Sequence, residues 1–527
     1  MDQRRLARSG IAYGLITGAS RIAGLAREIM AASYFGVTGA MSAFIIAFQV
    51  PNLVRALVAD VALEGGLIPV MTDLLEKGRR REAVGLILTL CLVITAGLGT
   101  LTALAVILAP VYMPLFAPGF SAPLQHLLVG LAQVMVPMVP LLSLGAVLSG
   151  TLYAHERFLI PAAGPVLWNV VVIVSLVVLV PQFDGDDRLY AYSVGVLLGT
   201  VAQVALPLPW MPKLDLPWRA SIDWRSAELR RVIALMLPVT IAWGGISLLL
   251  VMDSLIGTLV SARVPAAIDK AFRIYQLPQG IFAVAISVIL FTALAQAAAR
   301  QDMDGLRHTT TDGIRYLAFC LLPAAVGLAV LAQPIVALAF ERGAFTPRDT
   351  ELVSAAVVWW AIALPPSGLS LLLVRVYLAL QRPWDVARIT FVMLAINGVL
   401  AGALYRPLGM EGIVMATVVA TTACAALQLL RLREYLAPWD LREAGTAIAR
   451  MVIAAAVLGV VAGVISSLLS PHLNHTDLGT AITISVALSA GGASYLLVLI
   501  ALRAREPRAL GALLRRATPS PPPPPAP

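Results

Sequence analysis

The stretch SRIAGLAREIM (Ser20–Met30), followed by AFQVPNLVRALVAD (Ala47–Asp60), decides how the rest of the chain is interpreted. Both stretches are apolar enough to enter a bilayer, yet they carry five ionisable side chains: Arg21, Arg27, Glu28, Arg55 and Asp60. Ionisable groups inside a membrane are costly, and they normally face a water-filled cavity or a partner group. Basic groups on two successive spans therefore predict a binding site for an anion, with the remaining chain as its scaffold.

The composition of the whole chain is that of a polytopic membrane protein. Of its 527 residues, 59% are hydrophobic and 13% are charged, whereas soluble domains are about 25% charged. The net charge of +9 does not indicate nucleic-acid binding, because the basic residues gather in one set of loops. The three cysteines, Cys91, Cys320 and Cys424, all fall in apolar stretches and give no disulfide or metal framework.

The fold class expected is all-α, with about fourteen transmembrane helices, since a span needs about 20 apolar residues. The expected spans are 10–35, 40–68, 83–110, 124–154, 158–181, 189–211, 228–259, 271–298, 313–338, 351–380, 385–404, 410–432, 444–469 and 478–503. A short polar helix over 70–80 is expected after the second span.

Basic residues in alternate loops set the orientation, because cytoplasmic loops are enriched in Lys and Arg. The loops that share a side with the N-terminus contain Lys77 and Arg79–Arg81, and later Arg230, Arg231 and Arg300. The opposite loops are poor in basic residues or acidic, as at Asp184, Asp186 and Asp187. We therefore expect both termini in the cytoplasm, which agrees with an even number of spans. The final residues, Thr518–Pro527, are almost all proline and predict an extended segment.

An internal repeat runs through the chain at an offset of about 225 residues, as in transporters built from parallel repeats. The matching pairs are AFIIAFQVP (Ala43–Pro51) with AFRIYQLP (Ala271–Pro278), Leu108–Pro110 and Gly119 with Leu331–Pro334 and Gly343, and Tyr153 and Asn169 with Tyr377 and Asn397. Six spans per copy is an even number, so both copies have the same orientation. We expect lobes at 1–225 and 226–440, an added pair of spans in 441–505, and a proline-rich cytoplasmic tail at 506–527.

Polar groups from three expected spans are predicted to face one central cleft. In span 1, Arg21 and Glu28 share a helical stripe, and Arg27 lies about 100° from Glu28 around the helix. In span 2, Asn52 and Arg55 follow Pro51, which should kink the helix. In span 8, Arg273 and Gln276 share a face, close to Pro278.

Two interpretations of these charges remain open. Arg27 with Glu28, and Arg55 with Asp60, would be structural ion pairs, or the arginines would extend to the membrane surface. Alternatively, Arg21, Arg27, Arg55 and Arg273 bind an anion together, which their excess over nearby acids favours. Arginine suits phosphate in particular, because its planar guanidinium can bind two oxygens.

Other signals are weaker. Asp253 is a lone acid in span 7, and it is either a buried hydrogen-bonded group or a weak candidate for a cation site. His472 and His475 have the spacing of metal ligands but lie in a short polar loop, so no metal site is expected there. FERGAF (Phe340–Phe345) predicts a loop turn that could belong to an external gate. No catalytic carboxylate pair stands out, so we do not expect an enzyme.

Several of these motifs resemble the MurJ/MviN family of lipid II flippases in the MOP exporter superfamily. Besides the two opening stretches, the resemblance rests on FRIYQLPQGIFAVAI (Phe272–Ile286), FERGAF and LSGTLYAHERFLIPAAGPVLWN (Leu148–Asn169). It covers spans 1 to 12, and the two added spans also fit that family. The resemblance implies that Arg21, Arg27, Arg55 and Arg273 bind the substrate's diphosphate. The expected supporting residues are Ser20, Glu28, Asn52, Asp60 and Gln276.

The chain departs from the family pattern at several charged positions. Ser42 stands in place of an Asp, Gln49 in place of a basic residue, and Ala56 in place of a second Arg. The family's Tyr-Ala-Asp-Arg in span 8 is Lys270-Ala-Phe-Arg273 here. The phosphate-binding arginines are therefore kept, while the charges around them are altered.

The resemblance implies a flippase that moves lipid II, the undecaprenyl-diphosphate-linked disaccharide-peptide used in peptidoglycan synthesis, to the outer leaflet by alternating access. No cofactor is expected, but a coupling ion or counter-ion is open. Expected partners are lipid II, membrane lipid and proteins of cell-wall synthesis or division, with no nucleic acid. The alternative is export of another polyprenyl-diphosphate-linked oligosaccharide by the same superfamily. A cationic-drug exporter would need acids in place of the arginines, and a glycosyltransferase would need larger polar loops.

Overall fold

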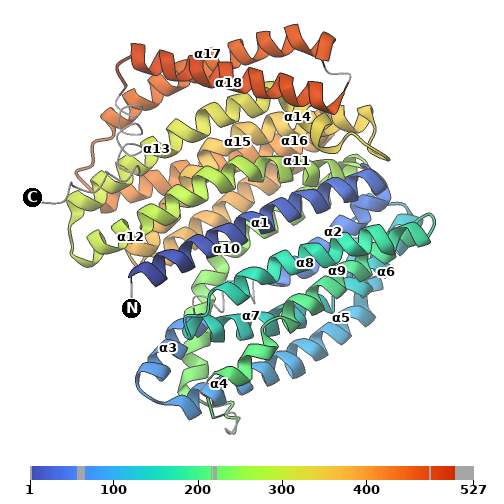
Figure 1. Ribbon diagram of the computed structural model, residues 1–527, viewed down its shortest axis with the longest axis vertical. Coiled ribbons are helices and arrows are strands. Elements are labelled where there is room, and N and C mark those ends of the chain that lie inside the picture. Colours follow the sequence, from blue (N-terminus) through green and yellow to red (C-terminus); the bar gives the residue numbers. More distant parts are fainter. Residues whose placement is uncertain (1–2, 56–65, 215, 218–221, 474–475, 505–527) are drawn as a thin grey trace, which may run out of the picture. The chain divides into compact units, whose positions relative to one another are not determined.

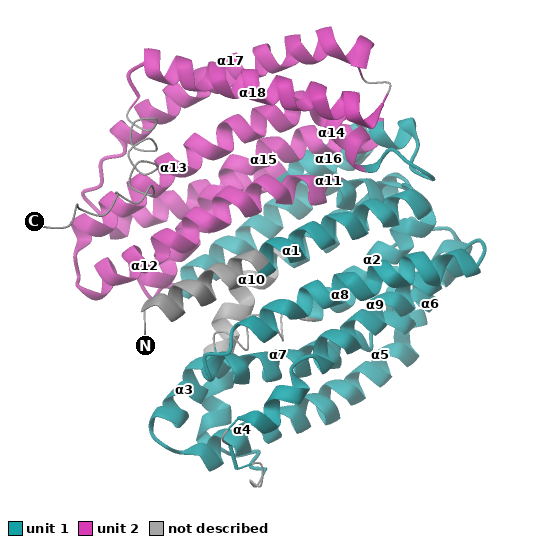
Figure 2. Cartoon of the chain, viewed as in Figure 1, with its two compact units in different colours: residues 1–270, 340–350, 383–417 teal, residues 271–339, 351–382, 418–527 magenta. Residues whose placement is uncertain are grey.

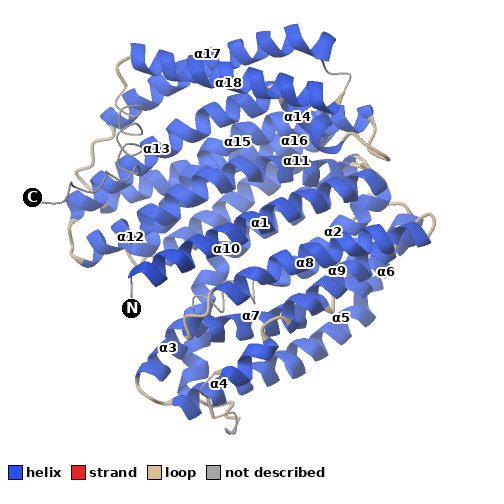
Figure 3. Cartoon of the chain, viewed as in Figure 1, coloured by secondary structure: helices blue, strands red, loops and turns tan. Residues whose placement is uncertain are grey.

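The computed structural model is built from helices connected by short loops (Figure 1). It describes the whole chain except residues 1–2, 56–65, 215, 218–221, 474–475 and 505–527. None of the described residues forms a strand, as the colouring by secondary structure shows (Figure 3). The prediction of an all-α membrane protein is therefore confirmed.

The chain divides into two compact units (Figure 2). Unit 1 comprises residues 1–270, 340–350 and 383–417, and unit 2 comprises residues 271–339, 351–382 and 418–527. Helices α11, α14, α15 and α16 each contribute residues to both units. The two six-span lobes expected from the repeat remain a prediction.

The helices of the first half lie wholly in unit 1. They are α1 (Gln3–Phe35), α2 (Gly39–Arg55), α3 (Ile68–Glu76), α4 (Arg80–Val93), α5 (Gly99–Tyr112), α6 (Ala122–Met135), α7 (Met138–Ala154), α8 (Leu159–Val178), α9 (Asp187–Ala205) and α10 (Ala227–Val260). Helix α3 confirms the short helix expected after the second span. The later helices are α11 (Val264–Pro278), α12 (Ala285–Ala299), α13 (Met303–Val330), α14 (Ala332–Phe340), α15 (Pro347–Ala379), α16 (Pro383–Tyr435), α17 (Arg442–Leu473) and α18 (Asp477–Ala501).

Ten helical stretches among the described residues are long and apolar enough to cross a membrane, and two shorter apolar helices accompany them. The expected number of fourteen is not confirmed. One reason is α16, which runs through the positions expected for two spans. Its backbone leaves the helical conformation at Gly409, where φ is +58°, so it consists of two helices joined at a kink.

Small residues allow the helices of unit 1 to pack closely, as in other membrane bundles. A Cβ atom on Gly24 of α1 would make an ordinary van der Waals contact, at 3.8 Å, with the side chain of Asn169 on α8. A Cβ atom on Gly199 of α9 would lie 3.1 Å from Trp168 of the same α8. Helix α8 is thus held between α1 and α9, and this packing places Trp168 and Asn169 beside the charged part of α1.

In unit 2, the added pair α17 and α18 packs against α13. The Tyr495 hydroxyl of α18 donates to the Phe319 carbonyl of α13 at 3.0 Å. A Cβ atom on Gly459 would lie 2.7 Å from Val326, so α17 approaches α13 without an intervening side chain. Buried Met451, Leu458 and Tyr495 belong to the core that these helices share.

Repeat-related residues make reciprocal contacts within unit 1. The Gly119 N–H donates to Oγ1 of Thr258 at 3.2 Å, and the Ala344 N–H donates to the Ser33 carbonyl at 2.7 Å. A Cβ atom on Gly119 would lie 2.0 Å from the Thr258 carbonyl oxygen, and one on its counterpart Gly343 would lie 2.3 Å from the Ser33 carbonyl oxygen. Each copy therefore presents a glycine turn to the end of a helix in the other copy.

Candidate functional site

Three charged side chains from distant parts of the sequence meet inside unit 1. The Glu28 carboxylate on α1 accepts a hydrogen bond from the Arg27 guanidinium through Oε1, and from Nζ of Lys270 on α11 through Oε2 at 2.7 Å. The Lys270 side chain is fully buried, and the side chains of Glu28 and Arg27 are 9% and 12% exposed. The cationic side chains of Arg27 and Lys270 thus share the negative charge of Glu28 at a site from which water is largely excluded.

Arg27 is held on its other side by an aromatic ring. Its guanidinium carbon lies 4.7 Å from the centre of the Trp168 ring, a cation–π contact that fixes the plane of the group. Its Nε is buried and finds no hydrogen-bond acceptor among the residues that the structure describes. A buried donor without an acceptor is costly, so the described residues do not fully satisfy the hydrogen-bonding groups of Arg27.

The structure places the other predicted site residues less completely. Arg21 is exposed, and Ser20 and Asn52 are half-buried. The Ser20 carbonyl accepts from the Asn169 amide at 3.4 Å. Asp60 and the side chain of Arg55 lie outside the described residues.

The two predicted site residues of span 8 belong to unit 2. There Arg273 is half-buried and Gln276 is exposed. Whether the four arginines converge on one cavity therefore remains a prediction.

The pairing of Arg27 with Glu28, which the sequence left as one of two interpretations, is observed. The contact of Lys270 was not predicted from the sequence, where this lysine stood out only as a departure from the family pattern. The available signal was a lysine inside an expected span, since such a residue normally has a partner there. Its partner lies 242 residues earlier in the chain.

Asp253 on α10 is fully buried and forms a second polar cluster in unit 1. Its Oδ2 accepts from the Thr417 hydroxyl at 2.7 Å, and its Oδ1 accepts from the Asn397 amide at 3.3 Å. Asn397 Oδ1 is buried and finds no donor within the described part of the chain. The cluster therefore offers carboxylate, hydroxyl and amide oxygens, which are the ligands of hard cations. No group of three or more His, Cys, Asp and Glu suited to a metal occurs among the described residues.

The predicted FERGAF turn is the loop between α14 and α15. Beyond its contact with Ser33, this segment is fixed by Asp349, whose buried carboxylate pairs with Arg263. The Arg263 Nε also donates to the Val37 carbonyl at 2.7 Å. We call this set of contacts, from Ser33, Val37 and Arg263 to Ala344 and Asp349, the clasp. It ties the end of α1 to the start of α15.

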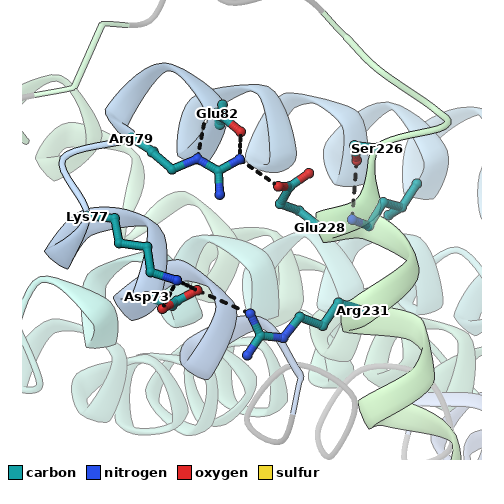
Figure 4. Close-up of polar contacts among 8 residues, drawn as sticks. Asp73, Lys77, Arg79, Glu82, Ser226, Glu228 and Arg231 are labelled. Atoms are coloured by element: carbon teal, nitrogen blue, oxygen red, sulfur yellow. Dashed lines mark hydrogen bonds and ion pairs between the residues drawn. The ribbon is translucent and has the colours of Figure 1, made fainter.

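A fourth polar cluster joins the loop after α3 to the start of α10 (Figure 4). Asp73 pairs with Lys77 at 2.8 Å and with Arg231 at 3.1 Å, while Arg79 donates to Glu82 and to Glu228. Hydrogen bonds from Lys77, and then from Arg231, lower the pKa of Asp73 below its usual value. These groups are largely exposed, so the ion pairs stabilise the fold only weakly.

Comparison with known proteins gives one consistent family. A model of the family described as "Lipid II flippase MurJ" matches residues 31–483. The "Probable lipid II flippase MurJ" of Vibrio cholerae is 26% identical and covers 95% of this chain and 97% of its own length. A protein of the same description from Rhizobium tropici is 29% identical, covering 94% of this chain and 92% of its own.

Solved structures show the same fold. "Lipid II flippase MurJ, inward closed conformation" superimposes with a TM-score of 0.78 at 20% identity, covering 94% of this chain and 99% of that one. An inward-facing multidrug resistance MATE family transporter of the MOP superfamily gives a TM-score of 0.69 at 14% identity, covering 81% and 98%.

Proposed function

This chain belongs to the MurJ family of lipid II flippases, as its motifs predicted, and from that premise we propose that it carries lipid II from the cytoplasmic to the outer leaflet of the bacterial plasma membrane. The observation that carries the proposal is the buried cluster of Arg27, Glu28 and Lys270, which retains a surplus positive charge inside a membrane helix bundle. The relatives that cover nearly the full length of the chain are named as lipid II flippases, which are transporters. The chain accordingly acts as a transporter.

The physical difficulty of the reaction is to move a diphosphate and its polar head group across about 30 Å of hydrocarbon. Arg21, Arg27, Arg55 and Arg273 offset the lost hydration of the diphosphate in a central cavity that opens alternately to each side. Charge-assisted hydrogen bonds to phosphate contribute roughly 1.5–3 kcal/mol each. The inside-negative membrane potential adds about 2.3 kcal/mol per negative charge per 100 mV to outward movement.

Return of the empty carrier is then the step that needs help, and the inside-negative membrane potential provides it to any cation that moves inward with the carrier. We assign this help to a cation bound at Asp253, Asn397 and Thr417, whose buried oxygens support a hard-cation site. Both termini lie in the cytoplasm under this proposal, as the Lys and Arg distribution predicts.

The test is complementation of a conditional lipid II flippase mutant, scored by labelling of flipped precursor at the cell surface. Arg27→Ala, Arg55→Ala and Arg273→Ala should each weaken substrate binding about tenfold or more, while Arg→Lys variants rescue only in part, because lysine lacks the two-pronged geometry. Arg388→Ala is the matched control, since Arg388 is 78% exposed and pairs only loosely with Asp385, at 3.7 Å.

If folded, abundant Arg55→Ala and Arg273→Ala proteins flip lipid II at normal rates, the arginines are structural and the cavity proposal is wrong. If the unaltered chain fails to complement the mutant but exports another lipid-linked oligosaccharide, the alternative function within the same superfamily is favoured.

A further inference from the structure

We propose that Lys270 is a positioning residue that keeps Arg27 available to the substrate by taking up part of the charge of Glu28. This inference deepens the proposed function and rests on it. It starts from a geometric fact: the two oxygens of Glu28 accept from two different cations, Arg27 at Oε1 and Lys270 at Oε2. Lys270 thus prevents Glu28 from binding the arginine with both oxygens.

The charge balance explains why this matters. An arginine and a carboxylate that face each other alone commonly form a two-pronged pair, and such a pair carries no net charge. A neutral pair in a dehydrated place would offer a diphosphate little attraction. With Lys270 added, the three linked groups carry one surplus positive charge. Lys270 itself is fully buried, so this surplus can reach an anion only through Arg27, which is 12% exposed.

The orientation of Arg27 supports the same inference. Trp168 covers one face of the guanidinium at 4.7 Å, and Glu28 accepts from Nη2. The buried Nε finds no acceptor within the described part of the chain. Lys270 is anchored independently, with its Nζ 5.8 Å from the centre of the Phe340 ring. The lysine therefore fixes Glu28, and Glu28 together with Trp168 fixes the direction in which Arg27 presents the N–H groups that are not bonded to Glu28.

The experiment measures binding of lipid II to the purified full-length chain, with inorganic pyrophosphate as competitor and undecaprenol as the uncharged control lipid. Lys270→Met should weaken lipid II binding about tenfold or more, because one charge-assisted interaction is lost at Arg27. Lys270→Arg should bind like the unaltered chain. Glu28→Gln/Lys270→Met, which leaves Arg27 with its own charge, should restore most of the affinity.

A purely structural ion pair gives a different pattern. In that case Glu28→Gln and Lys270→Met would weaken binding alike, and both would lower the thermal unfolding midpoint. Under the proposal, Glu28→Gln weakens lipid II binding less than Lys270→Met does, because it removes the negative charge that would otherwise neutralise Arg27. Arg263→Met is the control for removing the cationic partner of a buried carboxylate, since Arg263 pairs with buried Asp349 and not with Glu28.

Normal binding by folded Lys270→Met overturns the inference, and so does weak binding by the double variant. If Lys270→Met does not fold, the double variant decides alone, because it leaves neither partner of the pair charged. Failure of the unaltered chain to bind lipid II better than undecaprenol is a distinct result, which overturns the proposed function itself.

Discussion

The Oγ1 atom of Thr417 lies 2.7 Å from Oδ2 of Asp253, although 164 residues separate the two in the sequence. Asn397 completes the contact from the same long helix, α16, and leaves its own carbonyl oxygen buried without a donor among the described residues. The arrangement satisfies both oxygens of Asp253 and still leaves an oxygen for a further ligand. This geometry makes the cation proposal testable by substitutions at Asp253 and Thr417.

Asp253→Asn should remove the response of lipid II flipping to the coupling cation, because the amide keeps the size of the side chain but loses its charge. The ion concentration needed for half-maximal flipping should rise about tenfold or more. Flipping is measured in vesicles in which sodium, potassium and protons are varied one at a time. Thr417→Ser keeps the hydroxyl and should retain the response. An unchanged ion response in folded Asp253→Asn would leave Asp253 as a buried hydrogen-bonded group only.

Gly343→Ala should destabilise the clasp. Gly343 has φ of +61°, and an added Cβ atom would lie 2.3 Å from the Ser33 carbonyl oxygen. Gly78 has a similar φ of +70° but has nothing within 4 Å of an added Cβ, so Gly78→Ala is a matched control for backbone strain alone. Strain at such a position costs of order 1–3 kcal/mol. The thermal unfolding midpoint should fall for both variants and fall further for Gly343→Ala; equal midpoints would show that the clasp is not tightly packed.

The ion pairs of Asp73 should contribute to stability only above the pH at which this carboxylate titrates. Its pKa is lowered by Lys77 and Arg231, so the folded form binds a proton less readily than the unfolded chain. The stabilisation is therefore present above the usual pKa of 3.8 and is lost as the pH falls through the lowered value. Asp73→Asn should lower the thermal midpoint slightly at neutral pH, and the difference should shrink as the pH falls below 3.8 and through the lowered pKa. A difference that persists in acid would point to a cause other than charge.

The orientation predicted from the basic loops can be tested by cysteine accessibility. In a chain whose three native cysteines are replaced, Gly78→Cys should be labelled from the cytoplasm and Asp184→Cys from outside. Gly78 follows α3, and Asp184 precedes α9. Both positions are exposed, so a membrane-impermeant thiol reagent can reach them. Labelling of both from the same side would contradict the predicted topology.

The fold was predictable because a chain that crosses a bilayer must form long apolar helices. The lengths of these helices follow from the lengths of the apolar stretches in the sequence. The details that depend on backbone conformation were not predictable. The π-helical turn Gln279–Val284 interrupts the expected eighth span after Pro278. Gly409 forms a kink between two helices that follow each other directly, so two expected spans appear as the one helical stretch α16. Neither feature changes the hydrophobic pattern from which the spans were predicted.

The candidate site was predictable only in its composition. Arg27 and Glu28 stand out as charges in an apolar stretch, and their pairing follows from adjacency on α1. The third member, Lys270, could not be assigned from spacing, because a contact across 242 residues depends on how α11 packs in unit 1. The same limit applies to Asn397 and Thr417 around Asp253. Long-range partners of buried charges come from tertiary packing, which periodicity does not encode.

The reciprocal glycine contacts also bear on the evolutionary origin of the chain. Gly119 of the first copy meets Thr258 of the second, while Gly343 of the second copy meets Ser33 of the first. When each of two equivalent surfaces makes the same contact with the other, the arrangement is that of a two-fold interface between identical subunits. The same pattern would result if the chain descended from a shorter polypeptide that paired with itself and was then duplicated. In the present chain the two copies differ, since Glu28 has a lysine partner whereas Asp253 lies among neutral oxygens.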